Sequence, residues 1–152
     1  MSAIIEIDTD HGVIPSASAR VEMISAYSDE RGSLQTLINC QTNNVALISS
    51  AKGTVRSNHY HKTDWHYMYM ISGAADYLFR PAGSTEEPQH LLFKKGDLLY
   101  TGPMEEHATV FLEDSVLLAM SGHPRDQDTY EGDIVRVVLV TPEEAMERAA
   151  RH

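Results

Sequence analysis

The chain is dominated by short runs in which apolar and polar residues alternate, separated by turn residues such as Gly, Pro, Asp and Ser. A period of two predicts strands that bury one face, and many short strands at this spacing are typical of an all-β barrel or sandwich. The predicted strands cover residues 20–26, 33–38, 45–50, 55–61, 65–72, 74–79, 90–93, 98–100, 107–111, 115–121 and 134–140. The predicted turns cover residues 28–32, 81–84, 95–97 and 113–114.

The two ends of the chain depart from this pattern. Residues 1–17 are rich in turn-type residues and are expected to form a largely irregular arm, which leaves residues 18–152 as one domain. Near the other end, Thr141 can cap a helix, Pro142 fits its first turn, and Glu144 completes a capping-box pattern. The sequence therefore predicts one C-terminal helix on an otherwise all-β domain.

Histidines provide the strongest chemical signal. His59 and His61 are two residues apart on a predicted strand, so both imidazoles project from the same face. A turn at residues 62–64 can fold the chain back and bring His66 over that face, and His107 lies on a later strand. Asp64 has the same alternation as His66, so alternation alone leaves either side chain as a ligand. Because neutral imidazole is a common metal ligand, this cluster predicts a metal site.

The run that begins at Gly53 and ends at Gly73 resembles the first motif of the cupin superfamily, G-x5-H-x-H-x3,4-E-x6-G. His59 and His61 match the two motif histidines, and His66 stands where the motif has Glu.

The second cupin motif, G-x5-P-x-G-x2-H-x3-N, is matched less fully. Gly96 and His107 keep the motif's separation. Pro103 is shifted by one residue, the second glycine is absent, and Phe111 replaces Asn. The resemblance covers roughly residues 33–121 and implies a cupin-type jelly-roll β-barrel with a short C-terminal α-helix.

The same resemblance implies one divalent metal ion per chain, held by His59, His61, His66 and His107. Zinc is the first expectation, and iron, nickel or manganese are the alternatives. Four neutral imidazoles leave the ion its full +2 charge, which strengthens it as a Lewis acid.

A softer resemblance concerns the substrate. Residues 28–34 and the run from Arg56 to His61 look like cupins that modify nucleotide sugars, although Ser57 replaces a Gly of their pattern. Their aspartate–histidine proton relay is not identifiable in the sequence. The four-His arrangement is similar instead to small zinc cupins that cyclise polyketides.

These resemblances imply an isomerase, epimerase or cyclase that acts next to a carbonyl of a small-molecule substrate. Arg56 would hold an anionic group of that substrate, and Tyr100 or Glu106 would move the proton. The alternatives are a metal-dependent dioxygenase and a non-catalytic small-molecule-binding protein.

Composition limits the partners and the cellular compartment that we expect for this protein. A net charge of −10 without a basic run argues against nucleic-acid or anionic-membrane partners. No apolar run approaches the ~20 residues that span a bilayer, and the N-terminus lacks the features of a secretory signal. The single cysteine, Cys40, fits a reducing cytoplasm. A homodimer is expected, because it would cover open strand edges and the N-terminal arm.

Overall fold

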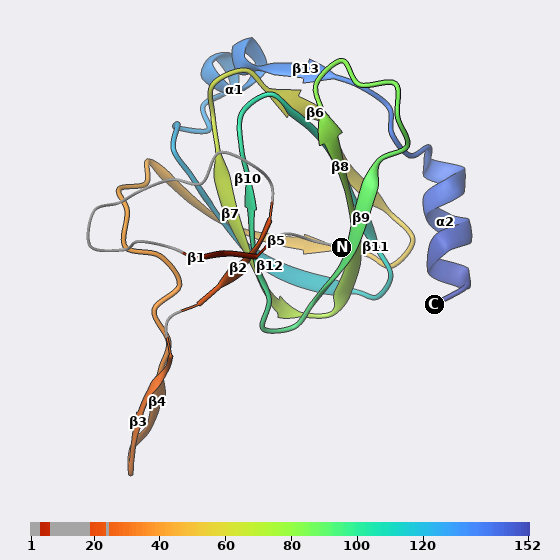
Figure 1. Cartoon of the computed structure of the whole chain (residues 1–152). Helices are drawn as coiled ribbons and strands as arrows, with labels where there is room; N and C mark the ends of the chain where they lie inside the picture. Colours follow the sequence, from red (N-terminus) through yellow and green to blue (C-terminus); the bar gives the residue numbers. More distant parts are fainter. Residues whose placement is uncertain (1–3, 7–18, 24) are drawn as a thin grey trace.

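Two β-sheets face each other and form a barrel in the computed structural model, which describes residues 4–6, 19–23 and 25–152 (Figure 1). One sheet has six strands, in the order β1 (Ile4–Glu6), β2 (Ala19–Glu22), β10 (Leu98–Thr101), β7 (His66–Ser72), β12 (Ser115–Ser121) and β5 (Asn44–Ser50). The other has five, in the order β13 (Ile134–Arg136), β6 (Val55–His61), β11 (Glu105–Phe111), β8 (Ala74–Pro81) and β9 (Gln89–Lys94). The predicted all-β cupin-type jelly roll with a C-terminal helix is confirmed.

Side-chain alternation on β7 decides which residues fill the barrel. Met68 and Met70 point inward and join the core between the sheets, together with Tyr77, Phe93 and Phe111. Tyr67 and Tyr69 lie on the opposite face of β7, in a second apolar cluster. Burial of one large apolar side chain stabilises a fold by about 1.5–3 kcal/mol, so these two faces fix the register of the strand.

Part of the outer face of the six-stranded sheet is covered by an irregular segment. Two predicted strands are shorter in the structure. The strand predicted over residues 33–38 ends at Leu34, and the strand predicted over residues 20–26 is β2, which ends at Glu22. Beyond Leu34, the side chains of Leu37, Ile38 and Cys40 pack partly buried against the cluster that contains Tyr67. The apolar pattern there is satisfied by packing onto the sheet, without strand pairing.

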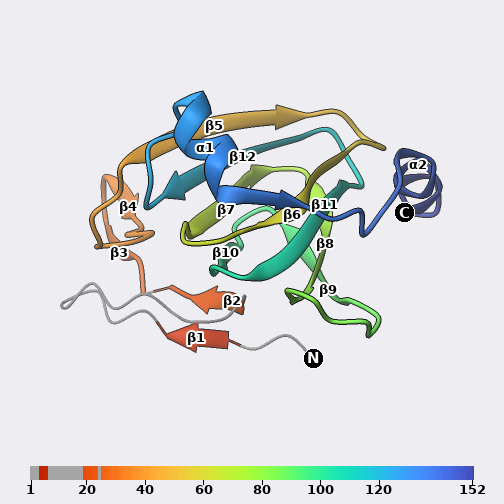
Figure 2. The ribbon, with the colours of Figure 1, turned by 90° about the horizontal axis from the view of Figure 1, so that it is seen from above.

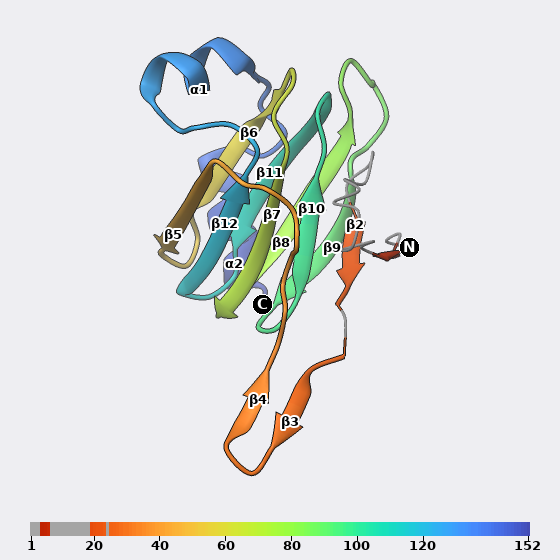
Figure 3. The ribbon, with the colours of Figure 1, turned by 90° about the vertical axis from the view of Figure 1, so that its left-hand side faces the viewer.

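The predicted turn over residues 28–32 lies in a projecting hairpin, in which residues 30–31 connect two short strands. Strands β3 (Tyr27–Asp29) and β4 (Gly32–Leu34) pair with each other and extend away from the barrel (Figure 3). Asp29 binds Arg31 across the turn. The exposed large side chains Tyr27 and Leu34 lie on this hairpin.

Two helices accompany the barrel, where the sequence predicted one. Helix α2 (Pro142–Ala150) begins as predicted, because the Thr141 hydroxyl accepts a hydrogen bond from the backbone N–H of Glu144. It lies outside the five-stranded sheet (Figure 2). Ala145 packs there with Ala108 and Val110 of β11. Neither helix has the length and apolar composition needed to cross a membrane.

The second helix, α1 (Gln127–Asp133), lies with β13 across one end of the barrel (Figure 1). Its sequence has little apolar periodicity and includes Gly132, so pattern analysis missed it. Asp126 caps it by accepting a hydrogen bond from the Thr129 backbone N–H. At the start of the chain, Ile4–Glu6 forms a strand parallel to β2, within the arm that is expected to be largely irregular. The rest of that arm lies outside the described residues.

Gly73 closes the turn between β7 and β8, and we expect Gly73→Ala to destabilise the protein by about 3 kcal/mol. Its φ is +97°, and an added Cβ would lie 2.6 Å from the Asp114 carbonyl oxygen and 2.8 Å from Ser115 Cα. Gly83→Ala is the matched control, because Gly83 has a φ of +82° and open space around its Cα. That variant should lose only about 1–2 kcal/mol, the cost of the left-handed backbone alone. Urea denaturation measures both, and equal losses would contradict the steric argument.

Candidate metal centre and cavity

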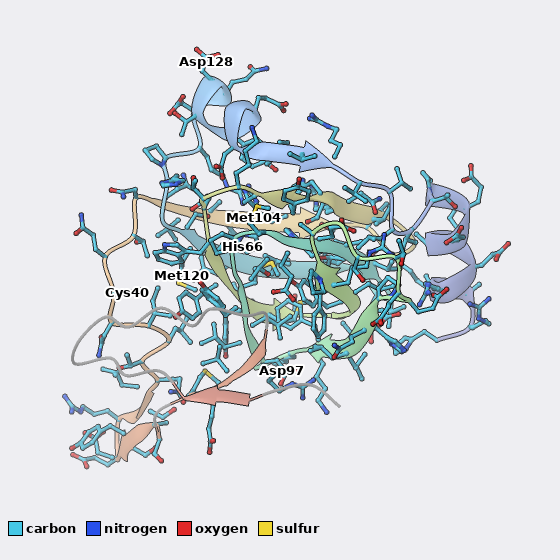
Figure 4. The ribbon with its side chains drawn as sticks, turned by 45° about the horizontal axis from the view of Figure 1, so that its top comes forward. Cys40, His66, Asp97, Met104, Met120 and Asp128 are labelled. Carbon is cyan, nitrogen blue, oxygen red and sulfur yellow. The ribbon has the colours of Figure 1, made fainter. Side chains whose placement is uncertain are left out.

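Four histidine side chains from three strands converge inside the barrel. His59 and His61 come from β6, His66 from β7 and His107 from β11, and all four are buried. One ring nitrogen from each of His59, His61 and His107 lies within 4.8 Å of the others. The centroid of the His66 ring is 5.5 Å from that of His61 and 5.4 Å from that of His107. His66 is labelled between the sheets in Figure 4.

A bulge in β6 brings Arg56 to the same side as the histidines. Arg56 and His59 are three residues apart, so regular alternation would place them on opposite faces. The pairing with β11 shifts between His107 and Ala108, where His107 faces His59 but Ala108 faces Ser57. Residue 58 is therefore the extra residue of a β-bulge, and both Arg56 and His59 line the interior.

The backbone of this bulge is unusual for its residue types. Ser57 has a φ of 76° and Asn58 a φ of 54°, in the left-handed region that glycine adopts more readily. Glycine, which the nucleotide-sugar cupin pattern has at the position of Ser57, would adopt this φ without steric cost. The Asn58 side chain holds the bulge: its Oδ1 accepts hydrogen bonds from the backbone N–H groups of Leu139 and Val140, and its Nδ2 donates to the Val140 carbonyl.

A hydrogen bond orients the ring of His107, and a carboxylate lies beside the ring of His61. His107 Nδ1 lies 2.9 Å from the Glu105 carbonyl oxygen, and a carbonyl only accepts, so the ring proton is on Nδ1. His107 Nε2 is then the nitrogen with a free lone pair. His61 Nδ1 lies 3.4 Å from Asp133 Oδ2, an ion-pair distance without the geometry of a hydrogen bond. A carbonyl or carboxylate behind the imidazole is the usual support of a metal-binding histidine.

The ring nitrogens without a hydrogen-bond partner indicate whether the cluster suits a metal ion. His61 Nε2, His66 Nδ1 and His107 Nε2 are buried and have no hydrogen-bond partner within the described part of the chain. A buried polar atom without a partner costs roughly 1–3 kcal/mol, and several such atoms in one cluster suit a common ligand. The donor set of neutral imidazoles fits zinc or another first-row divalent ion.

Burial keeps these imidazoles neutral. It lowers the pKa of His59 to about 2 and that of His107 to about 4, because charged imidazolium is poorly solvated there. Burial also lowers the pKa of His61, against the opposing effect of Asp64 and Asp133, and it lowers the pKa of His66 well below the ordinary value. At neutral pH all four side chains therefore have the protonation state that metal binding requires.

Asp133, at the end of α1, is a residue that sequence analysis missed. Its carboxylate accepts hydrogen bonds from the backbone and hydroxyl of Thr63 and from the backbone of Asp64. Burial alone would raise the pKa of Asp133, but these hydrogen bonds outweigh it and leave the pKa below its ordinary value. Asp133 fixes the turn between His61 and His66 from 70 residues away in the sequence, where no local pattern identifies it.

Asp64, the alternative ligand, has another role. Its Oδ1 accepts hydrogen bonds from the backbone N–H groups of Trp65 and His123. Asp64 therefore fixes the turn and the neighbouring strand end. It is not among the residues whose ligand atoms cluster closely enough to hold a metal ion, which are His59, His61 and His107.

A cavity of about 120 Å³ opens beside the histidines. Its apolar wall comes from both sheets and consists of Ile48, Met68, Phe111, Leu117 and Ala119. Its polar lining consists of Arg56, Ser57, His59, His66, Thr109, Arg125 and Tyr130. No carboxylate is among these lining residues, although the protein has a net charge of −10.

Arg56 is thus the one predicted catalytic residue that lines the cavity. Its Nε donates to Ser50 Oγ at 2.7 Å, and its Nη2 donates to the Ser49 carbonyl at 3.0 Å. Tyr100 is instead fully buried on the outer face of the six-stranded sheet, beside Tyr67. Burial raises the pKa of Tyr100.

Glu106 does not face the cavity either. It precedes His107 on β11, so its side chain projects from the opposite face of the sheet. There it accepts hydrogen bonds from Arg80 Nε and from the backbone of Gly83.

Tyr130 on α1 lines the cavity beside the histidines, and the sequence did not indicate it. The centroid of its ring is 5.8 Å from that of His61 and 6.2 Å from that of His59. The guanidinium carbon of Arg125 lies 5.3 Å from the centroid of the same ring. Both residues belong to the segment that follows β12, and only the folding of that segment over the barrel end brings them to the site.

Comparison with known proteins identifies relatives of the fold. No family model and no curated protein matches the sequence. The sugar 3,4-ketoisomerase QdtA from Thermoanaerobacterium thermosaccharolyticum, solved with TDP, superposes with a TM-score of 0.63 at 18% identity, over 88% of this chain and 95% of that one.

Two epimerases are similar as well. ChmJ, a 3'-monoepimerase from Streptomyces bikiniensis solved with dTDP-quinovose, gives a TM-score of 0.67 at 15% identity, over 84% of this chain and 72% of that one. The rmlC epimerase of Mycobacterium tuberculosis gives a TM-score of 0.66 at 14% identity, over 85% of this chain and 72% of that one. These likenesses show that the chain has the fold that those enzymes share.

The buried histidines predict acid sensitivity. In the folded, metal-free protein the pKa values of these histidines lie below the ordinary value of about 6.5. At a pH between the lowered and the ordinary value, the unfolded chain therefore binds more protons than the folded protein. In chelator-treated protein the free energy of unfolding should therefore be steady above about pH 7. Below pH 6.5 it should fall, by up to ~1.4 kcal/mol per pH unit for each such histidine.

Denaturation at pH 7.5, 6 and 5 measures this dependence. His59→Gln should reduce the slope, whereas His90→Gln, which changes a histidine with a 65% exposed side chain, should leave it unaltered. A flat profile from pH 7.5 to 5 would show that the cluster takes up protons in the folded state.

Proposed function

We propose that this protein is a metal-dependent isomerase, epimerase or cyclase that acts on the carbon next to a carbonyl of a sugar-like or polyketide-like small molecule. One observation carries the proposal. Three histidine nitrogens lie within 4.8 Å of one another, with unpartnered buried nitrogens, and two of the four histidines line a cavity with an apolar wall. The shared fold of 3,4-ketoisomerases and epimerases supports the reaction class by analogy.

His59, His61 and His107 would hold the ion, with His66 as the fourth ligand. Zinc is the first candidate, followed by iron, nickel and manganese. When bound, a divalent ion would supply Lewis acidity towards the carbonyl oxygen of a substrate. The apolar side chains of Met68, Phe111 and Leu117 line the cavity, and electrostatic interactions are stronger in such less polar surroundings than in water.

Proton transfer is assigned to residues that reach the cavity. Tyr100 and Glu106 face away from it, so the geometry favours the Tyr130 hydroxyl over either of them. Tyr130 lies at the cavity wall beside two of the histidines and is partly exposed, so that protons can exchange with solvent. Arg56 would bind an anionic group of the substrate, as a guanidinium with three N–H donors left after its bonds to Ser49 and Ser50.

A second reaction mode is favoured by the pair formed by His61 and Asp133. With its Nδ1 held beside a carboxylate, His61 could take a proton on Nε2 as a general base without a metal ion. This mode predicts activity that survives chelation.

The proposed assembly is a homodimer. The outer face of the six-stranded sheet exposes Val45, Leu47 and Ile71, and β5 is an edge strand of that sheet. The hairpin of β3 and β4 presents Tyr27 and Leu34 to solvent. A second copy of the chain would cover these apolar side chains and the open edge.

Protein purified without an affinity tag should contain about one divalent ion per chain by elemental analysis. His61→Ala removes a clustered nitrogen and should reduce this content at least tenfold, while His90→Ala, outside the cluster, should retain it. Asp133→Asn should weaken metal affinity by about 10–100-fold, because the carboxylate behind His61 is lost. Only trace metal in the unaltered protein, or equal content in all variants, would remove the metal from the proposal.

The reaction itself is tested by isotope exchange in D₂O. TDP-4-keto-6-deoxyglucose, the compound bound in a structure of a QdtA variant, is the first substrate to try. Deuterium should enter the carbon next to its carbonyl, as followed by NMR, with the metal-loaded protein and not with His61→Ala. Exchange that persists after chelation would favour the His61–Asp133 mode. Stoichiometric oxygen consumption would replace the proposal with a dioxygenase, and tight binding without exchange would indicate a binding protein.

A further inference from the structure

Arg125 differs from the arginines that pair with a carboxylate. Five arginines form an ion pair with a carboxylate, namely Arg20, Arg31, Arg80, Arg136 and Arg148. Arg125 forms no ion pair or hydrogen bond within the described residues, and its Nε is buried without a partner. A desolvated guanidinium nitrogen without a partner is unfavourable, so this position calls for an acceptor that the described chain does not supply.

The neighbouring carboxylate does not fill that role. Asp126 follows Arg125 directly, but its Oδ1 accepts a hydrogen bond from the Thr129 backbone and caps α1. The contact that positions Arg125 is the Tyr130 ring, whose centroid lies 5.3 Å from the guanidinium carbon. This cation–π contact orients the cation and leaves its N–H donors available.

Tyr130 lies close to both Arg125 and the histidine cluster. The Tyr130 ring is within 6.2 Å of the rings of both His59 and His61, measured between centroids. Arg125 and Arg56 line the same cavity, and no Asp or Glu shares that lining. Two cations without a carboxylate, in a protein with a net charge of −10, form an electrostatic site for an anion.

We propose that Arg125, together with Arg56, forms a subsite for an anionic group of the substrate, a carboxylate or a phosphate. Planar guanidinium groups match the geometry of both anions. The cavity of about 120 Å³ equals roughly four water volumes, so it admits the anionic group and the few atoms joined to it. The subsite rests on the proposed function in that the bound anion would hold a carbonyl beside the histidines that line the same cavity.

Binding of simple anions tests the subsite without turnover. Inorganic phosphate, pyruvate and TDP are titrated into the full chain by isothermal calorimetry, before and after chelation, so that anion binding to a metal is measured separately. At least one of the three should bind the unaltered chelated protein. Arg125→Gln should weaken that binding at least tenfold, and Arg125→Lys, which keeps the charge and loses the fork, should be intermediate.

Arg136→Gln is the matched control. It removes the same charge from β13, where Arg136 pairs with Glu131 and does not line the cavity. Binding by this variant should change less than twofold. Phosphate or pyruvate binding would identify a small acid as the source of the anion, and binding of TDP alone would identify a nucleotide diphosphate.

Three results would overturn the subsite: no anion binds the unaltered protein, Arg125→Gln binds as well as the unaltered protein, or Arg136→Gln is weakened equally. Circular dichroism and metal content show whether each variant is folded. Because anion binding needs no catalysis, loss of the isotope exchange with intact anion binding would reject the proposed reaction and leave the subsite standing.

Discussion

The bulge of β6 at Ser57 and Asn58 is the constraint on which the candidate site depends. Without it, Arg56 and the two histidines of β6 would lie on opposite faces of the sheet. Two non-glycine residues with positive φ cost roughly 1–2 kcal/mol each. The three hydrogen bonds between the Asn58 side chain and residues 139–140 contribute about 1 kcal/mol each, which is of the same size. The hydrogen bonds of the Asn58 side chain therefore offset the backbone strain of the bulge.

The contacts that hold the site come from one stretch near the C-terminus. Residues 139–140 bind Asn58 in the middle of β6, and β13 pairs with the following residues of β6, with Ile134 opposite His61. Asp133 then secures the turn that leads to His66. Packing of α2 against β11 anchors the end of this stretch. Disturbing the C-terminal segment should thus change the site although it contributes no histidine.

Charge is distributed unevenly between the protein as a whole and its cavity. The surface is strongly acidic, whereas the interior site combines neutral imidazoles with two arginines and lacks a lining carboxylate. Asp64 and Asp133 lie close by, but their oxygens accept hydrogen bonds from turn residues. Their negative charge is thereby used to shape the site and remains outside the space where a ligand would bind.

The sequence by itself determined the features that depend on local pattern. Alternation predicted β6 and β12 with their observed bounds, His-x-His spacing placed His59 and His61 together, and Thr141 marked the start of α2. Alternation also places Met68 and Met70 on the same face of β7 as His66, and in the structure both methionines join the core between the sheets.

The tertiary structure alone decided which polar residues accompany the histidines. Asp133, Arg125 and Tyr130 reach the site through packing between segments about 70 residues apart, which leaves no periodic signal in the sequence. The bulge turned Arg56 inward. Tyr100 and Glu106, which share strands with interior residues, face the opposite side of their sheets. Alternation gives the relative orientation of neighbouring residues, but the choice of the buried face and the partners across it are set by long-range contacts.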